Sequence, residues 1–527
     1  MKKNWIKVFA LILVCSFVLS ACSGNSDQDS EASTETTNES SENKSGSDST
    51  IVLGGNRDPA PGAQDPYFLN VNLYVWEPLI GLTDDGELLP VLATEWSMTE
   101  DAKKWTFTLK EGVSFSDGEA FNADAVIANF ERYKTMGVVT SNFFPFNIDS
   151  IYPGLSEVVK ADDYTITLTF DNPVPMLPYQ MVNWGSCMFS PNCYDADTGE
   201  FTDYCIGTGQ FVVSDHKADE YLLLERNDNY YGDPASTEFI EIRVIPEEET
   251  RVAALHSGEI QGVYDNNAIT PLSAVELEEE GGYTLSSTLS ANIYYIAVNN
   301  ENYPFNDVRM RQALSMIIDR DTIVNQIYQG YGKPISHLLS PLSSFSEDIE
   351  VQYDPDKAKE LAAEVLQGDS PTIRLYTMPD YQTNAELIAT WMEELGLTVD
   401  MQVMDSNAQA EKRKSGDYDL AMTMQGLSSY DPGVMLTRFM AKDGDLNTTY
   451  KLNYSNSEAD ALFEELNTTF VLEDRMAIYT QLQEICAEDL PSIPLIAASN
   501  LVVHSNDITG YDAKYTGASI YETEWAK

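Results

Sequence analysis

The chain has 527 residues and carries 84 Asp and Glu against 31 Lys and Arg, a net charge of −53 at pH 7. This length exceeds what one hydrophobic core usually supports, so we expect two or three domains, and 43% apolar residues exclude a mainly disordered chain. A strongly negative field repels phosphate backbones, which argues against nucleic acid as a partner, and four scattered histidines argue against a His-built metal site.

The first 21 residues have the pattern of an export signal. Three lysines precede an almost entirely apolar run from Val8 to Leu19, which is too short to span a membrane comfortably. The run ends in Leu-Ser-Ala-Cys, which looks like a bacterial lipobox whose cysteine is acylated. We therefore expect residues 1–21 to be a signal peptide and Cys22 to be the lipid-attachment site. A plain secretory signal that happens to contain Cys22 is the alternative.

A polar segment follows the lipobox. Residues 23–50 are rich in Ser, Thr and acidic residues and contain nothing that could enter a core, so 22–50 is predicted to be a disordered, lipidated tether. A flexible coil of this length spans roughly 30 Å. The segment would hold a globular body on the extracytoplasmic face of the cell membrane, with membrane contact through the lipid alone. A phosphorylation-regulated tail is the rival interpretation.

From Ile51 to about Tyr204 the pattern is mainly that of β-structure. Apolar residues alternate over 105–109, a turn follows, and Val113 and Phe115 alternate back, which predicts an antiparallel meander. Another alternating strand spans 164–170. One helix interrupts these strands, with Asn122 as its expected cap.

From about Asn292 the rhythm becomes that of an α/β protein. Helical spacing covers 308–330, and Asp354-Pro355 opens another helix. Strands are expected at 373–377, 399–403 and 419–424, with a helix between the first two. Strands that alternate with helices predict parallel pairing. Residues 497–504 are expected to carry the chain back toward the first domain.

The sequence contains no recognisable catalytic motif. It has no G-x-S-x-G, H-E-x-x-H or P-loop, and Gly207-Thr208-Gly209 lacks the third glycine of a dinucleotide fingerprint. We therefore expect no enzyme activity, no cofactor and no metal site. Cys187, Cys193 and Cys205 do not match zinc spacing, and a disulfide between two of them is left open.

Several segments of the body resemble the bacterial extracellular solute-binding proteins of family 5, the peptide- and nickel-type binding components of ABC importers. The resemblance lies in the order and spacing of the segments and runs from about Ile51 to the C-terminus. Gln210 replaces a family proline, and Gln261 replaces a family aspartate. The matching segments are Pro90–Trp96, Trp105–Lys110, Val113–Gly118, Ala123–Val126, Gly207–Phe211, Asn227–Gly232, Arg251–Ile260 and Phe305–Leu314.

This resemblance implies an α/β fold of the periplasmic-binding-protein type, with two hinged lobes that close over a ligand cleft. It corresponds to the large type II cluster, which has an extra β-rich domain. Lobe I would be discontinuous, comprising 51–82, 207–288 and 500–527, with the β-rich subdomain at 83–206. Lobe II would cover 289–499.

One candidate site residue follows from the strand pattern itself. Ligands of open α/β sheets lie beyond the carboxyl ends of the strands, and Asp431 follows the strand at 419–424. Peptide-binding members of the family use an aspartate in a similar Asp-Pro loop to pair with the peptide ammonium, so the resemblance gives Asp431 that role. A structural Asx-Pro turn is the alternative. Tyr430, Trp184 and Asn183 are further candidates to line the cleft, although packing in the core is an equal alternative for Trp184.

The predicted function is therefore capture of short peptides by a monomeric receptor that delivers them to an ABC permease. A nickel or metallophore-chelate receptor is the alternative within the same class. The segment 181–187 contains no arginine of the kind that holds an anionic chelate, which favours peptides. A peptide-pheromone sensor or a surface chaperone is the alternative from another class.

Overall fold

This computed structural model describes residues 49–59, 72–83, 86–136, 138–139, 146–182, 187–202, 206–265, 268–426, 430–515 and 517–527. The predicted signal peptide, the lipid site Cys22 and most of the tether lie outside these residues, as do Asn183, Trp184 and Cys205. In the described residues, no helix has the length and apolar character needed to cross a membrane.

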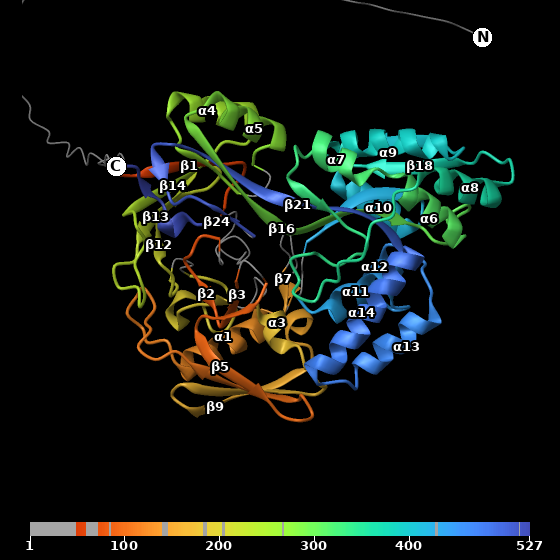
Figure 1. Ribbon diagram of the computed structural model, residues 1–527. Coiled ribbons are helices and arrows are strands. Elements are labelled where there is room, and N and C mark those ends of the chain that lie inside the picture. The colour runs from red at the N-terminus through yellow and green to blue at the C-terminus, as the bar shows by residue number, and fades with distance from the viewer. Residues whose placement is uncertain are drawn as a thin grey trace, which may run out of the picture. The chain divides into compact units, whose positions relative to one another are not determined.

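One large mixed sheet runs through the body (Figure 1). In spatial order its strands are β12 (Phe211–Lys217), β13 (Tyr221–Arg226), β14 (Phe239–Val244), β1 (Ile51–Gly55), β15 (Gly262–Tyr264), β21 (Ser492–Ser505), β16 (Tyr283–Val298), β20 (Leu420–Gln425), β18 (Thr372–Thr377) and β19 (Thr398–Val403), with β17 (Gly332–Pro334) paired to β21. We call the five strands from β12 to β15 the first half-sheet. We call β20, β18 and β19 the second half-sheet.

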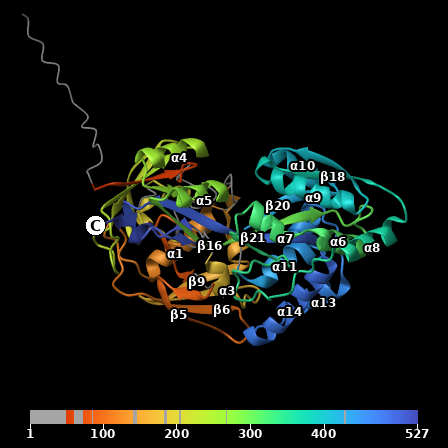
Figure 2. The same cartoon turned by 45° about the horizontal axis from the view of Figure 1, so that its top comes forward.

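The two long antiparallel strands β16 and β21 join the half-sheets (Figure 2). Their register shifts in the middle: Leu289 faces Ser499, but Ile293 faces Ala497. β16 therefore contains two more residues than β21 between these pairs. A bulge of this kind bends a strand and raises its twist. The predicted lobe boundaries at 288/289 and 499/500 fall inside these two strands, close to the bulge.

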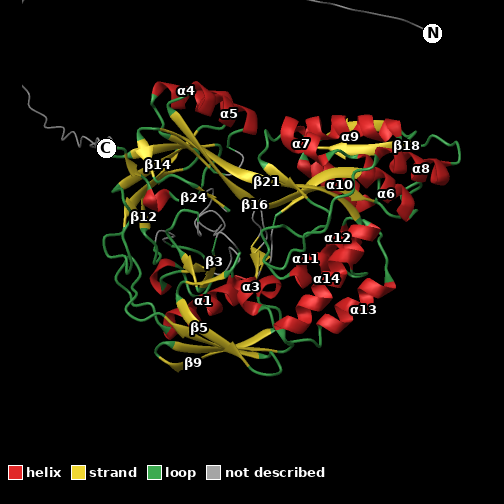
Figure 3. Ribbon diagram, in the orientation of Figure 1, coloured by secondary structure: helices red, strands yellow, loops and turns green. Residues whose placement is uncertain are grey.

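Parallel pairing in the second half-sheet confirms the α/β pattern of the sequence. β18 pairs in parallel with both β19 and β20. Helices flank both half-sheets: Figure 3 shows α4 and α5 above the first, α7 and α9 above the second, and α11, α13 and α14 below it. The helices are α1 (Ala123–Met136), α2 (Ile148–Ile151), α3 (Leu177–Met181), α4 (Glu248–Ser257), α5 (Pro271–Glu280), α6 (Val308–Ile317), α7 (Arg320–Gln326), α8 (Pro355–Leu366), α9 (Gln382–Glu394), α10 (Ser406–Ser415), α11 (Pro432–Met440), α12 (Asp445–Thr449), α13 (Ser457–Leu466) and α14 (Leu472–Asp489).

A separate antiparallel sheet forms the β-rich part. Its order is β5 (Ala93–Met98), β6 (Lys104–Leu109), β10 (Thr165–Phe170) and β9 (Leu155–Asp162), and α1 begins after Asn122, whose side chain accepts hydrogen bonds from the backbone N–H of Asp124 and Ala125. The return strand expected at Val113 and Phe115 is wrong. Both side chains are buried, but the segment is a turn held by one bridge from Ser114 to Ala120.

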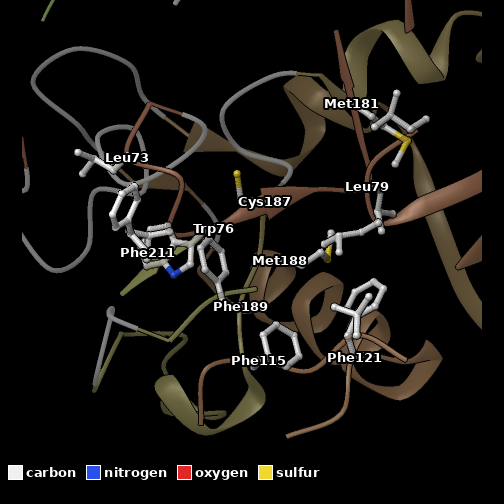
Figure 4. Packing of buried hydrophobic residues seen from close by; sticks show 14 of the residues in the cluster. Leu73, Trp76, Leu79, Phe115, Phe121, Met181, Cys187, Met188, Phe189 and Phe211 are labelled. Atoms are coloured by element: carbon white, nitrogen blue, oxygen red, sulfur yellow. The ribbon is translucent and has the colours of Figure 1, made fainter. Parts of the chain in front are cut away.

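The β-rich part shares its core with the first half-sheet. Ile51 and Leu53 of β1 belong to the same buried cluster as Phe107 of β6. Figure 4 shows the centre of this cluster, where the ring of Trp76 meets that of Phe189 edge-on at 4.3 Å. Because one core serves both parts, we expect them to unfold together.

The glycine turn singled out in the sequence has a packing role. A Cβ on Gly207 would lie 2.1 Å from the carbonyl oxygen of Val75, and one on Gly209 would lie 2.0 Å from that of Tyr74. The Asn227 side chain donates a hydrogen bond to the Gly209 carbonyl. The segments 207–211 and 227–232, which both carry the family resemblance, are therefore joined by a hydrogen bond.

Candidate ligand-binding site

The carboxyl ends of the strands define two edges at which a ligand of an α/β protein is expected. In the second half-sheet, β18, β19 and β20 run parallel, so their carboxyl ends share one edge. In the first half-sheet, β1 runs parallel to β14 and β15 and defines the other edge. Asp431 follows β20 as predicted.

Asp431 is buried and engaged by its own chain. Its side chain caps α11, where Oδ1 accepts hydrogen bonds from the Gly433 backbone N–H and from the Tyr479 hydroxyl, both at 2.8 Å. The residue is 4% exposed. These contacts fit the Asx-Pro turn that the sequence left as the alternative, and the ammonium-binding role of Asp431 stays a prediction.

A buried arginine lies close to this carboxylate. The Arg475 guanidinium lies 3.9 Å from Asp431 Oδ2 and donates hydrogen bonds to the Tyr479 hydroxyl and to the carbonyl oxygens of Leu466 and Thr469. Burial raises the pKa of Asp431 above its ordinary value, while Arg475 and the hydrogen bonds oppose that shift. The loss of hydration therefore affects the pKa of Asp431 more than the neighbouring charge of Arg475 does.

Sequence reasoning missed Arg475 and Tyr479. They lie four residues apart on α14, a spacing that places them on one face of a helix. That spacing was visible in the sequence, but nothing local indicated that this face meets Asp431.

Tyr430 lies in a small apolar cluster that joins distant segments. We call this group of residues the bridging cluster. It combines segments that the domain prediction assigns to lobe I, to the β-rich subdomain and to lobe II. Its buried members are Leu82, Leu339, Leu342, Tyr430 and Met435, and the half-buried residues packed on it include Leu88, Tyr179, Val182, Ala291 and Tyr515.

Burial in the bridging cluster raises the pKa of the Tyr430 hydroxyl well above its usual value. Contact of Tyr430 with a ligand stays a prediction. Trp184 and Asn183 lie outside the described residues. Just before them, Tyr179 of α3 meets the ring of Phe345, a residue assigned by the prediction to lobe II, edge-on at 5.0 Å.

The bulge in β16 lies next to the carboxyl end of β20. A Cβ on Gly426 would come within 3.1 Å of Asn292 Oδ1, and the Asn292 backbone N–H donates a hydrogen bond to the Ser290 hydroxyl. The bulge of β16 and the edge of the second half-sheet are thus in direct contact.

The edge of the first half-sheet carries charged residues that the sequence analysis did not single out. Arg57 follows β1, and its Nε lies 2.7 Å from Oδ2 of Asp265, which follows β15. Asp58 is 5% exposed and contacts Nε2 of His216 through both carboxylate oxygens at 3.0 Å. The signal that could have revealed Arg57 was its position two residues beyond the end of a strand.

A small cavity of about 190 Å³ lies elsewhere, between α6, α7 and the end of α14. Arg320 in its wall already donates to the carbonyl oxygens of Ser315 and Pro494. The cavity contains none of the edge residues and so does not belong to the candidate site.

The described residues offer little support for a metal site or a reactive thiol. Its His, Cys, Asp and Glu residues form no group of three or more that could hold a metal ion. Cys187 and Cys486 are buried free thiols, and burial raises the pKa of both. Cys193 is buried with its sulfur 3.9 Å from the Ile206 carbonyl oxygen. A pairing with Cys205 lies outside the described residues.

Comparison with known proteins connects these features to one family. The family model for bacterial extracellular solute-binding proteins, family 5, matches residues 87–447. Heme-binding protein A of Haemophilus influenzae is 26% identical over 96% of both chains. The probable D,D-dipeptide-binding periplasmic protein DdpA of Escherichia coli is 25% identical over 80% of this chain and 81% of its own.

Solved structures show the same fold. NikA from Brucella suis, in complex with Fe(III)-EDTA, gives a TM-score of 0.78 at 20% identity and covers 90% of this chain and 100% of its own. DppA from Helicobacter pylori, in complex with the peptide STSA, gives a TM-score of 0.70 at 22% identity and covers 91% of this chain and 98% of its own. The fold is therefore the two-lobed fold of periplasmic binding proteins, and the chain belongs to the bacterial extracellular solute-binding proteins of family 5.

Proposed function

We propose that this protein is the extracytoplasmic substrate-binding component of an ABC importer, which captures short peptides between its lobes and delivers them to a membrane permease. The observation that carries the proposal is family membership over most of the body, together with relatives named for dipeptides, D,D-dipeptides and glutathione. The arrangement of charges at the two strand edges supports a ligand with charged ends.

The proposed lobes are 51–82, 207–288 and 500–527 for lobe I, with 83–206 as its β-rich subdomain, and 289–499 for lobe II. The strand bulge at 290–292 supports a hinge there. The protein acts as a monomer and carries out no chemical reaction. Acylation at Cys22 and the tether 22–50 would hold it on the outer face of the cell membrane.

Within the cleft, Asp431 is the proposed partner of the peptide ammonium, and Tyr430, Trp184 and Asn183 would line the site. A hydrogen bond to a charged group contributes about 1.5–3 kcal/mol. Asp431→Asn should therefore weaken the binding of free peptides at least tenfold and should abolish the preference for free over N-acetylated peptides. Asp431 already contacts Tyr479 and Arg475, so the ammonium would have to bind a carboxylate that the chain itself also holds.

The chain offers a matched control for this test. Asp405 also follows a strand of the second half-sheet and caps α10 by accepting the Ala408 backbone N–H at 2.9 Å. Asp405→Asn removes the same charge from a similar cap and should leave peptide binding unchanged. If wild type binds free and N-acetylated peptides equally, or if both variants behave alike, the ammonium-binding role is wrong.

A metal-chelate or heme ligand is the second candidate. Solved relatives hold Fe(III)-EDTA and Ni(L-His)2, and the relative from Haemophilus influenzae is named for heme. Calorimetry with nickel–histidine complexes and with heme separates these ligands from peptides. A peptide-pheromone sensor or a surface chaperone would use the same fold, and a gene neighbourhood without permease and ATPase genes would favour those roles.

A further inference from the structure

The inference concerns loop 337–347, which follows β17 and which the domain prediction assigns to lobe II. It rests on the peptide-binding function proposed above. The loop contains no helix or strand, yet most of its residues are buried. Gln483 of α14 holds it through two hydrogen bonds: Nε2 donates to the Phe345 carbonyl oxygen at 3.0 Å, and Oε1 accepts the Glu347 backbone N–H at 2.8 Å. The loop is therefore attached to α14.

The loop also meets segments that the prediction assigns to lobe I and its β-rich subdomain. A Cβ on Gly86 would lie 2.3 Å from the Leu342 carbonyl oxygen, so the two backbones are in close contact. Leu339 and Leu342 share the bridging cluster with Leu82 and Leu88. The loop is thus a place where the proposed lobes touch.

His337 closes this loop through both nitrogens of its ring. Its Nε2 lies 2.8 Å from the Glu347 carbonyl oxygen, and its Nδ1 lies 3.3 Å from the Leu339 backbone nitrogen. A carbonyl oxygen only accepts a hydrogen bond, and a backbone N–H only donates one. The ring must therefore carry its proton on Nε2 and none on Nδ1, so these contacts select the neutral imidazole.

The surroundings of His337 oppose a second proton. The residue is 3% exposed, and burial lowers its pKa below the ordinary value. Among the charged groups that face it, Glu347 and Asp348 favour protonation, whereas Lys333 of β17 opposes it and pairs with Asp348 at 3.3 Å. On the side of α14 lies the Cys486 thiol, which is uncharged near neutral pH because burial raises its pKa to about 12. Loss of hydration is the largest of these influences.

We infer that His337 is a proton sensor that couples acid to release of the ligand. A proton added to Nδ1 would point at the N–H of Leu339, and neither group could accept a hydrogen bond from the other. The protonated ring therefore favours a loop that has moved away from it. Because the loop carries contacts between the proposed lobes, acid should favour the open receptor and weaken peptide binding.

The other three histidines differ from His337 in their surroundings. His216 and His256 lie 3.0 and 2.9 Å from a carboxylate oxygen, so a proton on either ring would add an attraction. His504 is buried, and burial lowers its pKa as well. It lies on β21, outside loop 337–347, and it therefore serves as a control for the effect of protonating a buried histidine.

The test measures hydrogen exchange of the backbone amides of 338–347 at about pH 7.5 and about pH 5.5, corrected for the intrinsic exchange rate. A histidine whose pKa is lowered in the folded loop stabilises it fully above the ordinary pKa of about 6.5, and this stabilisation is lost as the pH falls. At one pH unit below that value, the released loop should be about tenfold more populated. The protection factor of wild type should therefore fall about tenfold without any ligand.

Two variants remove the titration and keep one hydrogen bond each. His337→Gln keeps a donor for the Glu347 carbonyl oxygen, and His337→Asn keeps an acceptor for the Leu339 N–H. In both variants the protection factor of the loop should be the same at the two pH values. His256→Gln and His504→Gln are the matched controls and should keep the tenfold fall.

Peptide binding is then measured on the same proteins. The probe is the peptide that wild type retains best from a random-sequence library of di- to pentapeptides. Calorimetry should show that wild type and both control variants bind it more weakly at the lower pH, by up to about tenfold. His337→Gln and His337→Asn should show no such loss.

Each outcome decides a separate point. A constant protection factor in wild type, or an equal fall in the two His337 variants, would overturn the role of His337. So would a fall that disappears in His504→Gln. A loop that responds as expected while peptide affinity stays constant would overturn the coupling to ligand release. If wild type retains no peptide, the proposed function fails and ligand release fails with it, whereas the exchange data still decide whether His337 controls the loop.

Discussion

The rings of Tyr430 and Tyr515 meet edge-on at 6.5 Å, although 85 residues separate them in the chain. Tyr430 follows β20 of the second half-sheet, and Tyr515 follows β23 (Ala513–Lys514) in the segment predicted to belong to lobe I. The bridging cluster around them joins segments of the two proposed lobes through apolar side chains. Burial of these side chains would contribute to the free energy of lobe closure.

Leu342 is the residue in which this idea can be tested. It is 8% exposed, and a Cβ on Gly86 would lie 2.3 Å from its carbonyl oxygen. Leu342→Ala should lower the free energy of unfolding by about 2–5 kcal/mol. It should also weaken peptide binding, because it lowers the closed population without removing a contact to the ligand. Solution scattering should show a larger radius of gyration without ligand.

Leu272→Ala is the matched control, because Leu272 is 53% exposed on α5. Its effect on stability should stay within about 0.5 kcal/mol. An unchanged radius of gyration and an unchanged affinity in Leu342→Ala would show that the bridging cluster does not hold the lobes together.

Asp431 and Arg475 should respond unequally to substitution. Asp431→Asn keeps the cap and the hydrogen bond from Tyr479, so the free energy of unfolding should change by less than about 1.5 kcal/mol. Arg475→Met leaves a buried carboxylate without its cation and should cost about 3–5 kcal/mol. Urea unfolding of both variants measures the difference, and the reverse order would contradict the contacts described here.

The same pair predicts a pH dependence. Because the pKa of Asp431 is raised in the folded state, its contribution to stability is complete below the ordinary aspartate pKa and is lost as the pH rises through the folded value. The difference in free energy of unfolding between wild type and Asp431→Asn should therefore fall as the pH rises from about 4. A difference that grows with pH would mean that Arg475, rather than burial, dominates the pKa of Asp431.

Gly209 should tolerate no side chain. A Cβ there would overlap the Tyr74 carbonyl oxygen at 2.0 Å, and rigid backbone cannot move aside as a flexible side chain can. Gly209→Ala should cost more than about 3 kcal/mol. Gly112 has φ +76° and no neighbour within 4 Å, so Gly112→Ala should cost only about 1–2 kcal/mol of backbone strain. Thermal unfolding that ranks the two variants equally would contradict the packing explanation.

Cys22→Ser should release the protein from the membrane. The acyl chain is the only proposed membrane contact, and Cys22 belongs to the predicted tether, so the melting temperature should not change. Fractionation without detergent measures the release. Retention of the variant in the membrane fraction would show that the attachment has another source.

Periodicity in the sequence predicted the elements of the body well, because alternating and helical spacing report burial directly. The parallel strands β18, β19 and β20 and the caps Asn122 and Asp354 appear where the pattern placed them. The strand expected at Val113 failed because two buried side chains also fit a tight turn.

The site was harder to predict, because its contacts join residues that are distant in the chain. The Asp-Pro pattern predicted both a cap and a ligand contact at Asp431, and only the position of Arg475 and Tyr479 showed how its carboxylate is held. Arg57 and Asp265 are 208 residues apart and meet because β1 and β15 pair in parallel. No local pattern contains that information.

Native mass spectrometry of a secreted Cys22→Ser chain, mixed with a random-sequence library of di- to pentapeptides, with nickel–histidine complex and with heme, tests the central claim most directly. The account predicts one added mass per protein molecule, equal to that of a single free-acid peptide. A protein that carries the nickel complex or heme and no peptide, or that carries no ligand at all, would contradict it.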